Sequence, residues 1–142
     1  MKRTQAIMIR EVTGQLPHLP DQAITDKVNE PHPYQRGRWF YVELHLGNYG
    51  LYGPAALGVV SVNDGDEDYD RAELVSMFVE DCVRGGGYGT QIIEAAGARW
   101  PNLIWTDGPG SLHFHEKLVE RGVSYLIPHG AGYYQFIPKG DR

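Results

Sequence analysis

The chain has 142 residues, of which 18 are acidic and 13 are basic, and its formal net charge is -5. A chain of this size is expected to form one domain with a core that needs no disulfide or metal, and its negative charge gives no electrostatic attraction to nucleic acid or to an anionic membrane. The only cysteine, Cys82, excludes an internal disulfide; with no signal-peptide pattern and no apolar run of membrane length, a cytoplasmic protein is expected.

The first half of the chain is predicted to be mostly β-structure. Runs rich in β-branched and aromatic residues predict strands at 6–12, 38–46, 56–62 and 72–79. Residues 13–37 contain four prolines and can hold only short helices, near 20–29. Short turn-rich connections separate the later strands, which predicts an antiparallel meander.

The second half alternates helices with strands. A helix is predicted from Tyr88 to Trp100, with Ile92, Ile93 and Ala96 on one apolar face and Pro101 after its end. A short buried strand is expected at 103–106. The next predicted helix, at 111–121, has Ser111 as its N-cap and Gly122 as its C′ residue. Two final strands, at 123–128 and 132–138, complete a mixed α/β protein.

A glycine-rich loop joins the strand at 72–79 to the helix that begins at Tyr88. Its glycines are Gly85, Gly86, Gly87 and Gly89. A strand, a glycine loop and a helix N-terminus together present free backbone N–H groups to an anion, and phosphate is the usual guest. No lysine follows the glycines, which excludes a P-loop, and Thr90 stands where a dinucleotide fingerprint needs its third glycine.

Arg84, Gly87 and Gly89 form the pattern R-x-x-G-x-G between an apolar strand and an amphipathic helix. With this context, the stretch LVSMFVEDCVRGGGYGTQII resembles the first motif of the GNAT superfamily of acetyl-coenzyme A-dependent N-acetyltransferases. The stretch GPGSLHFHEKLVERGV, at 108–123, resembles the second. The resemblance extends over 72–123 by motif and over most of 38–136 by the order of elements. It implies an α/β fold with a mixed, mostly antiparallel sheet of six to seven strands and about four flanking helices.

The resemblance also implies a binding site for acetyl-coenzyme A as co-substrate. Residues of the loop and of the two helix starts would hold the pyrophosphate end: Arg84, Gly85, Gly87, Gly89, Thr90 and Ser111. The backbone of Met77, Phe78 and Val79 would pair with the pantetheine arm like an added strand. No metal is expected, because His113 and His115 point about 200° apart on a helix and the other histidines have no ligand spacing.

Transfer of an acetyl group needs a neutral amine, and removing a proton from a lysine-like amine at neutral pH costs roughly 4.6 kcal/mol. Glu73 is the first candidate for the base. Strict alternation would place it on one apolar face with Val75, Met77 and Val79, where burial would raise its pKa, and its position resembles that of the glutamate base of GNAT histone acetyltransferases. Glu80 is the rival candidate; it lies on the opposite alternation unless a β-bulge reverses it.

The departing thiolate needs a proton donor. His115 stands where the family has a tyrosine, and imidazolium can donate near neutral pH; Tyr133 and Tyr134 are alternative donors. Gly108 replaces the family's usual asparagine. The sequence therefore predicts N-acetylation of a primary amine on a small molecule or a protein, by a monomer or homodimer. A coenzyme A-binding module without transfer activity and a protein-interaction domain on the same fold are the alternatives.

Overall fold

The structure is a computed structural model that describes residues 5–12, 37–47, 54–63, 72–79, 85, 87–106, 112–128 and 132–142. The strands are β1 Gln5–Val12, β2 Gly37–Leu46, β3 Ala56–Asn63, β4 Ala72–Val79, β5 Ile104–Thr106, β6 Ser124–Leu126 and β7 Tyr133–Phe136. The described helices are α2 Tyr88–Arg99, α3 Leu112–Glu120 and the short 3-10 helix η2 Lys139–Asp141. Each predicted strand is therefore present, with ends that differ by a few residues. The short helices expected near 20–29 lie outside the described residues.

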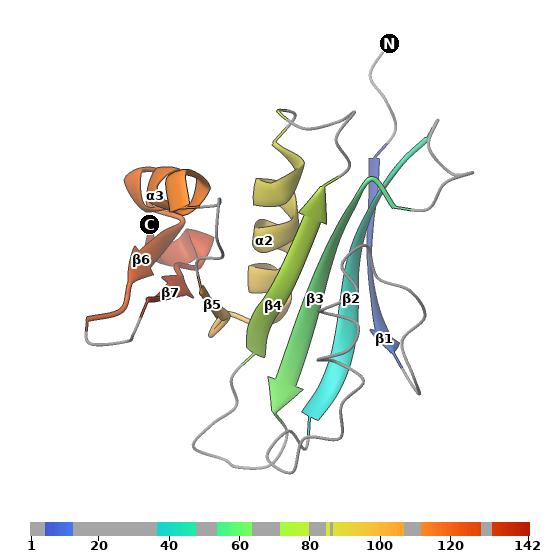
Figure 1. Ribbon diagram of the computed structural model, residues 1–142, viewed down its shortest axis with the longest axis horizontal. Helices are drawn as coiled ribbons and strands as arrows, with labels where there is room; N and C mark the ends of the chain where they lie inside the picture. Colours follow the sequence, from blue (N-terminus) through green and yellow to red (C-terminus); the bar gives the residue numbers. More distant parts are fainter. Residues whose placement is uncertain are drawn as a thin grey trace.

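The strands form one seven-stranded sheet in the order β1-β2-β3-β4-β5-β7-β6 (Figure 1). The pair β4–β5 is parallel, and the other neighbouring pairs of described strands are antiparallel. This confirms the mixed, mostly antiparallel sheet. The meander β1 to β4 is continuous along the chain, whereas β5, β7 and β6 follow after α2, so the parallel pair lies where the two halves of the sheet meet.

The main core lies between the sheet and α2. Ile92, Ile93 and Ala96 of α2 are fully buried, which confirms the predicted apolar stripe. Two glycines allow the close approach. A side chain at Gly58 of β3 would place its Cβ 2.7 Å from Ile92 Cγ2, and a Cβ at Gly97 of α2 would overlap the ring of Phe136 on β7. The helix is thus held against both halves of the sheet.

The strand β4 changes face part of the way along. Val59 pairs with Ser76 but Val60 pairs with Leu74, so Val75 is an extra residue and β4 contains a β-bulge. Ala72 and Leu74 before the bulge and Met77 and Val79 after it therefore pack into the same core. The prediction that Glu73 shares a face with Val75, Met77 and Val79 was wrong: Glu73 lies on the face of the sheet opposite α2.

Two local features fix the ends of elements. Gly122 follows α3 with a φ of 74°. The N–H of Gly122 donates to the carbonyl of Val119, and the N–H of Val123 donates to the carbonyl of Leu118. This is a Schellman cap at the predicted C′ residue.

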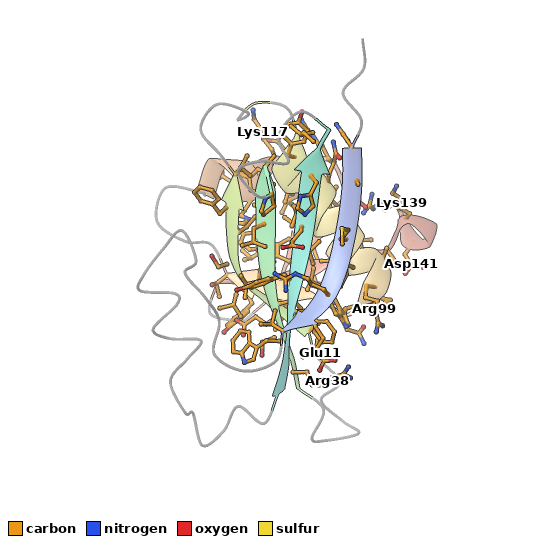
Figure 2. The ribbon with its side chains drawn as sticks, turned by 90° about the vertical axis from the view of Figure 1, so that its right-hand side faces the viewer. Glu11, Arg38, Arg99, Lys117, Lys139 and Asp141 are labelled. Carbon is orange, nitrogen blue, oxygen red and sulfur yellow. The ribbon has the colours of Figure 1, made fainter. Side chains whose placement is uncertain are left out.

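An ion pair joins the ends of the first two strands. Arg38 of β2 makes two 2.8 Å hydrogen bonds to Glu11 of β1; Figure 2 shows this pair at the lower end of the sheet. These bonds and the Arg38 charge hold the pKa of Glu11 below its ordinary value.

Neither α2 nor α3 is long and apolar enough to span a membrane.

Candidate active site

The candidate site is built around the second half of β4. On one edge of this strand, Met77, Phe78 and Val79 pair with Gly58, Leu57 and Ala56 of β3. On the other edge, the pairing between the described residues of β4 and β5 is limited to Glu73 and Ile104. Figure 1 shows β5 beside the start of β4 only, while β4 continues beyond it. Among the described residues, the β4–β5 ladder is thus confined to Glu73, and the rest of β4 runs on beside β3.

The glycine loop ends at the N-terminus of α2 with left-handed backbone. Gly85 has a φ of 88°, and Gly87, the N-cap residue, has a φ of 78°. A Cβ at either position would meet nothing within 4 Å, so the backbone conformation, and not packing, requires glycine there. Among the described residues, no side chain caps this end of the helix. The bond from Gln91 N–H to Gly87 O, at 3.2 Å, is the first of the helix, which leaves the N–H groups of residues 88–90 without an intrahelical acceptor.

Gly89 connects this helix start to β4. Its Cβ, if present, would lie 3.2 Å from Met77 Cε and 3.3 Å from Phe114 Cζ of α3. The first turn of α2 is therefore pressed against the second half of β4 on one side and against α3 on the other. This contact places the N-terminal turn of α2 beside the second half of β4.

These features fit coenzyme A. A helix N-terminus with two left-handed glycines suits a pyrophosphate, and an extended strand edge beside it suits a pantetheine arm, which carries amide groups that hydrogen-bond like a peptide. Gly89 lies against Met77, so the helix start that carries Gly87 and Thr90 adjoins the strand that carries Met77, Phe78 and Val79; their role in cofactor binding stays a prediction. Arg84, Ser111 and the rival base Glu80 lie outside the described residues, as do Cys82 and Gly108.

Glu73 and Tyr133 come together on the other side of the sheet from α2. Glu73 pairs with Ile104 of β5, and Ile104 pairs with Gln135 of β7, two residues from Tyr133. The negative charge of the Glu73 carboxylate, followed by partial burial, raises the pKa of Tyr133 above its ordinary value.

His115 occupies a different environment from the one its predicted role requires. It is buried in α3, and its Nδ1 accepts a 3.0 Å hydrogen bond from the indole N–H of Trp105 on β5. Its ring stacks on Tyr134, with 5.2 Å between ring centroids. Because an indole can only donate, this bond requires an unprotonated Nδ1 and places the ring proton on Nε2. The imidazolium that the prediction required for proton donation would break this bond.

Two features of this region were missed from the sequence. Trp105 was predicted only as part of a buried strand, although a buried indole N–H needs an acceptor and the nearby histidine-containing helix was a signal for one. A hollow of about 570 Å³, lined among others by Gly87, Thr90, Arg121 and Lys139, begins at the N-terminal turn of α2. Arg121 and Lys139 bring positive charge to this hollow, and Glu94 brings a negative charge. Among the described residues, no three histidine, cysteine, aspartate or glutamate side chains gather as metal ligands.

No protein-family model matches the chain, and no curated protein matches it in sequence. Solved structures do match. An acetyltransferase from Bacillus subtilis in complex with coenzyme A is 17% identical, with a TM-score of 0.56 over 88% of this chain and 79% of that one. A GNAT-family acetyltransferase from Staphylococcus aureus is 11% identical, with a TM-score of 0.51 over 93% of this chain and 99% of that one. AtaTR bound with acetyl-coenzyme A is 12% identical, with a TM-score of 0.51 over 94% of each chain.

These likenesses establish the fold. The chain has the mixed, seven-stranded fold of the GNAT acetyltransferases, as the resemblance implied. At these identities the likeness carries no residue roles across, so the chemistry of the site rests on its own geometry.

Proposed function

We propose that the protein is an N-acetyltransferase that transfers an acetyl group from acetyl-coenzyme A directly to a primary amine in a ternary complex. The observation that carries this proposal is the division of β4. Its first half holds a carboxylate, Glu73, at the residue that pairs with β5, and the first turn of α2 packs against its second half through Gly89 and Met77.

The binding groups of the proposed site are mostly backbone. The N–H groups of residues 88–90 and the helix dipole would hold the pyrophosphate, because both favour negative charge at a helix start. The backbone of Met77, Phe78 and Val79 would align the pantetheine arm along β4. When bound, acetyl-coenzyme A supplies an activated acetyl thioester. A strand N–H directed at its carbonyl oxygen would stabilise developing negative charge.

Glu73 is proposed as the base. A lysine-like amine is almost fully protonated at neutral pH, and making it nucleophilic costs roughly 4.6 kcal/mol. A carboxylate next to the amine, reached directly or through one water, takes the proton from nitrogen onto one of its own oxygens, and this removes the barrier of a solvent encounter. Glu73 is part of the sheet itself, so its backbone position is fixed relative to the edge of β4. Glu80 is the alternative base.

The acceptor is proposed to be an amine of a small molecule or of a protein. The face that carries Glu73 also carries the half-buried Trp39, because Glu73 and Trp39 both pair with Ser61 of β3. An aromatic face with a carboxylate attracts an ammonium group through charge and cation–π interactions.

Two measurements test the proposed function. Isothermal titration calorimetry with acetyl-coenzyme A should show binding, whereas ATP, which carries phosphates but no pantetheine arm, should bind more weakly. A free-thiol assay should then show coenzyme A release that depends on an added amine; a lysine peptide, a polyamine and an aminoglycoside are suitable probes. An absence of binding at millimolar acetyl-coenzyme A would refute the proposal. Binding without thiol release for any amine would favour a coenzyme A-binding module.

A further inference from the structure

A buried cluster of three rings holds α3 on the sheet. His115 of α3 is 6% exposed and Trp105 of β5 is 1% exposed. The indole N–H of Trp105 donates to His115 Nδ1 over 3.0 Å, and the His115 ring stacks on Tyr134 of β7 with 5.2 Å between centroids. Tyr134 in turn stacks on Trp105 at 6.4 Å. His115 is therefore joined to β5 by a hydrogen bond and to β7 by stacking.

The hydrogen bond exists in only one protonation state of His115. An indole can only donate, so Nδ1 must keep its lone pair in order to accept. A protonated imidazole has a donor at each nitrogen, and its Nδ1–H would face the indole N–H. Protonation would therefore remove the bond, set two donors against each other and place a charge inside the cluster. Each of these costs free energy in a buried site.

The ionisable groups around α3 do not change charge in the acid range. The described elements that pack against α3 are β5, β6, β7 and the first turn of α2. Their ionisable side chains are all tyrosines, namely Tyr88, Tyr125, Tyr133 and Tyr134, and a tyrosine ionises near pH 10. On α3 itself, the charged neighbours Glu116 and Lys117 are exposed. Within these elements, His115 is the group that acid would charge.

Phe114 connects this cluster to the proposed cofactor site. Its ring meets that of His115 edge-on, with 5.4 Å between centroids. On its other side, a Cβ at Gly89 would lie 3.3 Å from Phe114 Cζ. Gly89 belongs to the first turn of α2, whose N–H groups are proposed to hold the pyrophosphate. A shift of α3 away from β5 would therefore withdraw the support of this turn.

We propose that the bond between Trp105 and His115 is an acid-sensitive latch. While His115 is unprotonated, the bond holds α3 on β5 and keeps Phe114 against the first turn of α2; a proton on Nδ1 opens the latch and weakens the binding of acetyl-coenzyme A. The effect on the cofactor rests on the proposed function. By linkage, bound acetyl-coenzyme A opposes the protonation of His115.

NMR spectroscopy tests the latch without ligand. Long-range ¹⁵N–¹H correlations show which imidazole nitrogen carries the proton; the His115 signals disappear in His115→Asn and the indole signal in Trp105→Phe, and backbone assignment of the wild type serves if either variant does not fold. Between about pH 7.5 and about pH 5, across the titration range of free histidine, Nδ1 should gain a proton and the Trp105 indole signal should shift with the same midpoint. An Nδ1 that is protonated at the start or never gains a proton, or an indole signal that does not follow it, would overturn the latch.

Calorimetry tests the effect on the cofactor. Over the same pH range, the Kd for acetyl-coenzyme A should rise at least about fivefold, the low end of coupling between two sites. The phosphates of the cofactor also gain protons in this range, so the comparison between variants is decisive. His115→Asn keeps an acceptor for the indole but cannot be charged, and its Kd should rise less. His45→Asn, at a half-buried histidine of β2, is the matched control and should behave as the wild type does.

The outcomes separate the two proposals. If acetyl-coenzyme A binds but the wild type and His115→Asn lose affinity in parallel as the pH falls, the latch does not act on the cofactor site and the proposed function stands. If acetyl-coenzyme A does not bind at any pH while the Trp105 and His115 signals still move together, the proposed function fails, the effect on the cofactor fails with it, and the latch itself is supported.

Discussion

The two halves of β4 belong to one strand but have different surroundings. Before the bulge at Val75, the strand pairs with β3 and, at Glu73, with β5. After the bulge, its described pairing is with β3 alone, and the first turn of α2 packs against it through Gly89 and Met77. The first half thus places a side chain, and the second half presents backbone.

This difference shows how one extra residue, Val75, can give the two halves of one strand different roles. Without the bulge, Glu73 and Met77 would share a face, so either a carboxylate would enter the core or Met77 and Val79 would leave it. With the bulge, Ala72 and Leu74 before it and Met77 and Val79 after it all face the core. Glu73 stays on the face opposite α2. We therefore expect the bulge to be necessary for both folding and activity.

Deleting Val75 should have the largest effect. The deletion restores regular alternation, which either buries the Glu73 carboxylate without a partner or exposes Met77 and Val79. Each change costs several kcal/mol of unfolding free energy. Urea denaturation should show a variant that is unfolded or severely destabilised, whereas Val75→Ala, which keeps the residue count, should remain folded. A deletion variant of near-normal stability would contradict the assigned role of the bulge.

Glu73→Gln should separate the catalytic role of the first half of β4 from the binding role of its second half. Removing a general base lowers turnover by about 10² to 10⁴-fold, whereas binding by the second half of β4 does not use this side chain. The free-thiol assay should show the loss, and calorimetry should show an unchanged Kd for acetyl-coenzyme A. Unchanged turnover over the whole pH range would exclude Glu73 as the base.

Two glycines of the same helix region should respond in different ways. Gly97→Ala forces a Cβ against Phe136 and should cost about 1–3 kcal/mol of unfolding free energy, with little change in affinity per folded molecule. Gly87→Ala places a side chain in left-handed backbone, at a cost of about 1–2 kcal/mol, and should also weaken acetyl-coenzyme A binding because the new Cβ and the altered turn lie at the phosphate position. Equal affinities for both variants would argue against the glycine loop as the binding site.

The smallest expected effect is on the pH dependence of stability. The negative charge of Glu73 raises the pKa of Tyr133 in the folded protein, so the protonated tyrosine favours the folded state in full below the ordinary tyrosine value, about 10. This preference is lost as the pH rises through the raised value. The difference in unfolding free energy between wild type and Tyr133→Phe should therefore be constant from neutral pH to about pH 9 and shrink at higher pH. A difference that grows with pH would contradict the pairing.

The strands and α2 were predictable because their signals are local. Alternating β-branched residues mark the strands, and the spacing of Ile92, Ile93 and Ala96 marks the buried face of the helix. Gly122 was equally readable, because a left-handed cap favours glycine. The cofactor loop was also visible, since glycines that no packing requires stand out between a strand and a helix.

The arrangement of the side chains in the site was not predictable in the same way. Neither Val75 nor Ser76 differs from an ordinary strand residue, so the bulge left no mark in the sequence and the alternation of Glu73 was predicted wrongly. The pairing of Glu73 with Tyr133 depends on the register of three strands. The bond between Trp105 and His115 depends on how α3 docks on β5. Each is set by tertiary packing, which no single segment encodes.

The central claim is that the second half of β4 and the first turn of α2 together bind acetyl-coenzyme A. A ¹⁵N–¹H correlation spectrum recorded during a titration with acetyl-coenzyme A tests this most directly. The amide signals of residues 77–79 and 87–90 should shift together with one Kd, while those of residues 99, 100, 102 and 103, at the opposite end of α2, stay in place. Shifts confined to other segments, or no shifts at millimolar ligand, would contradict the account.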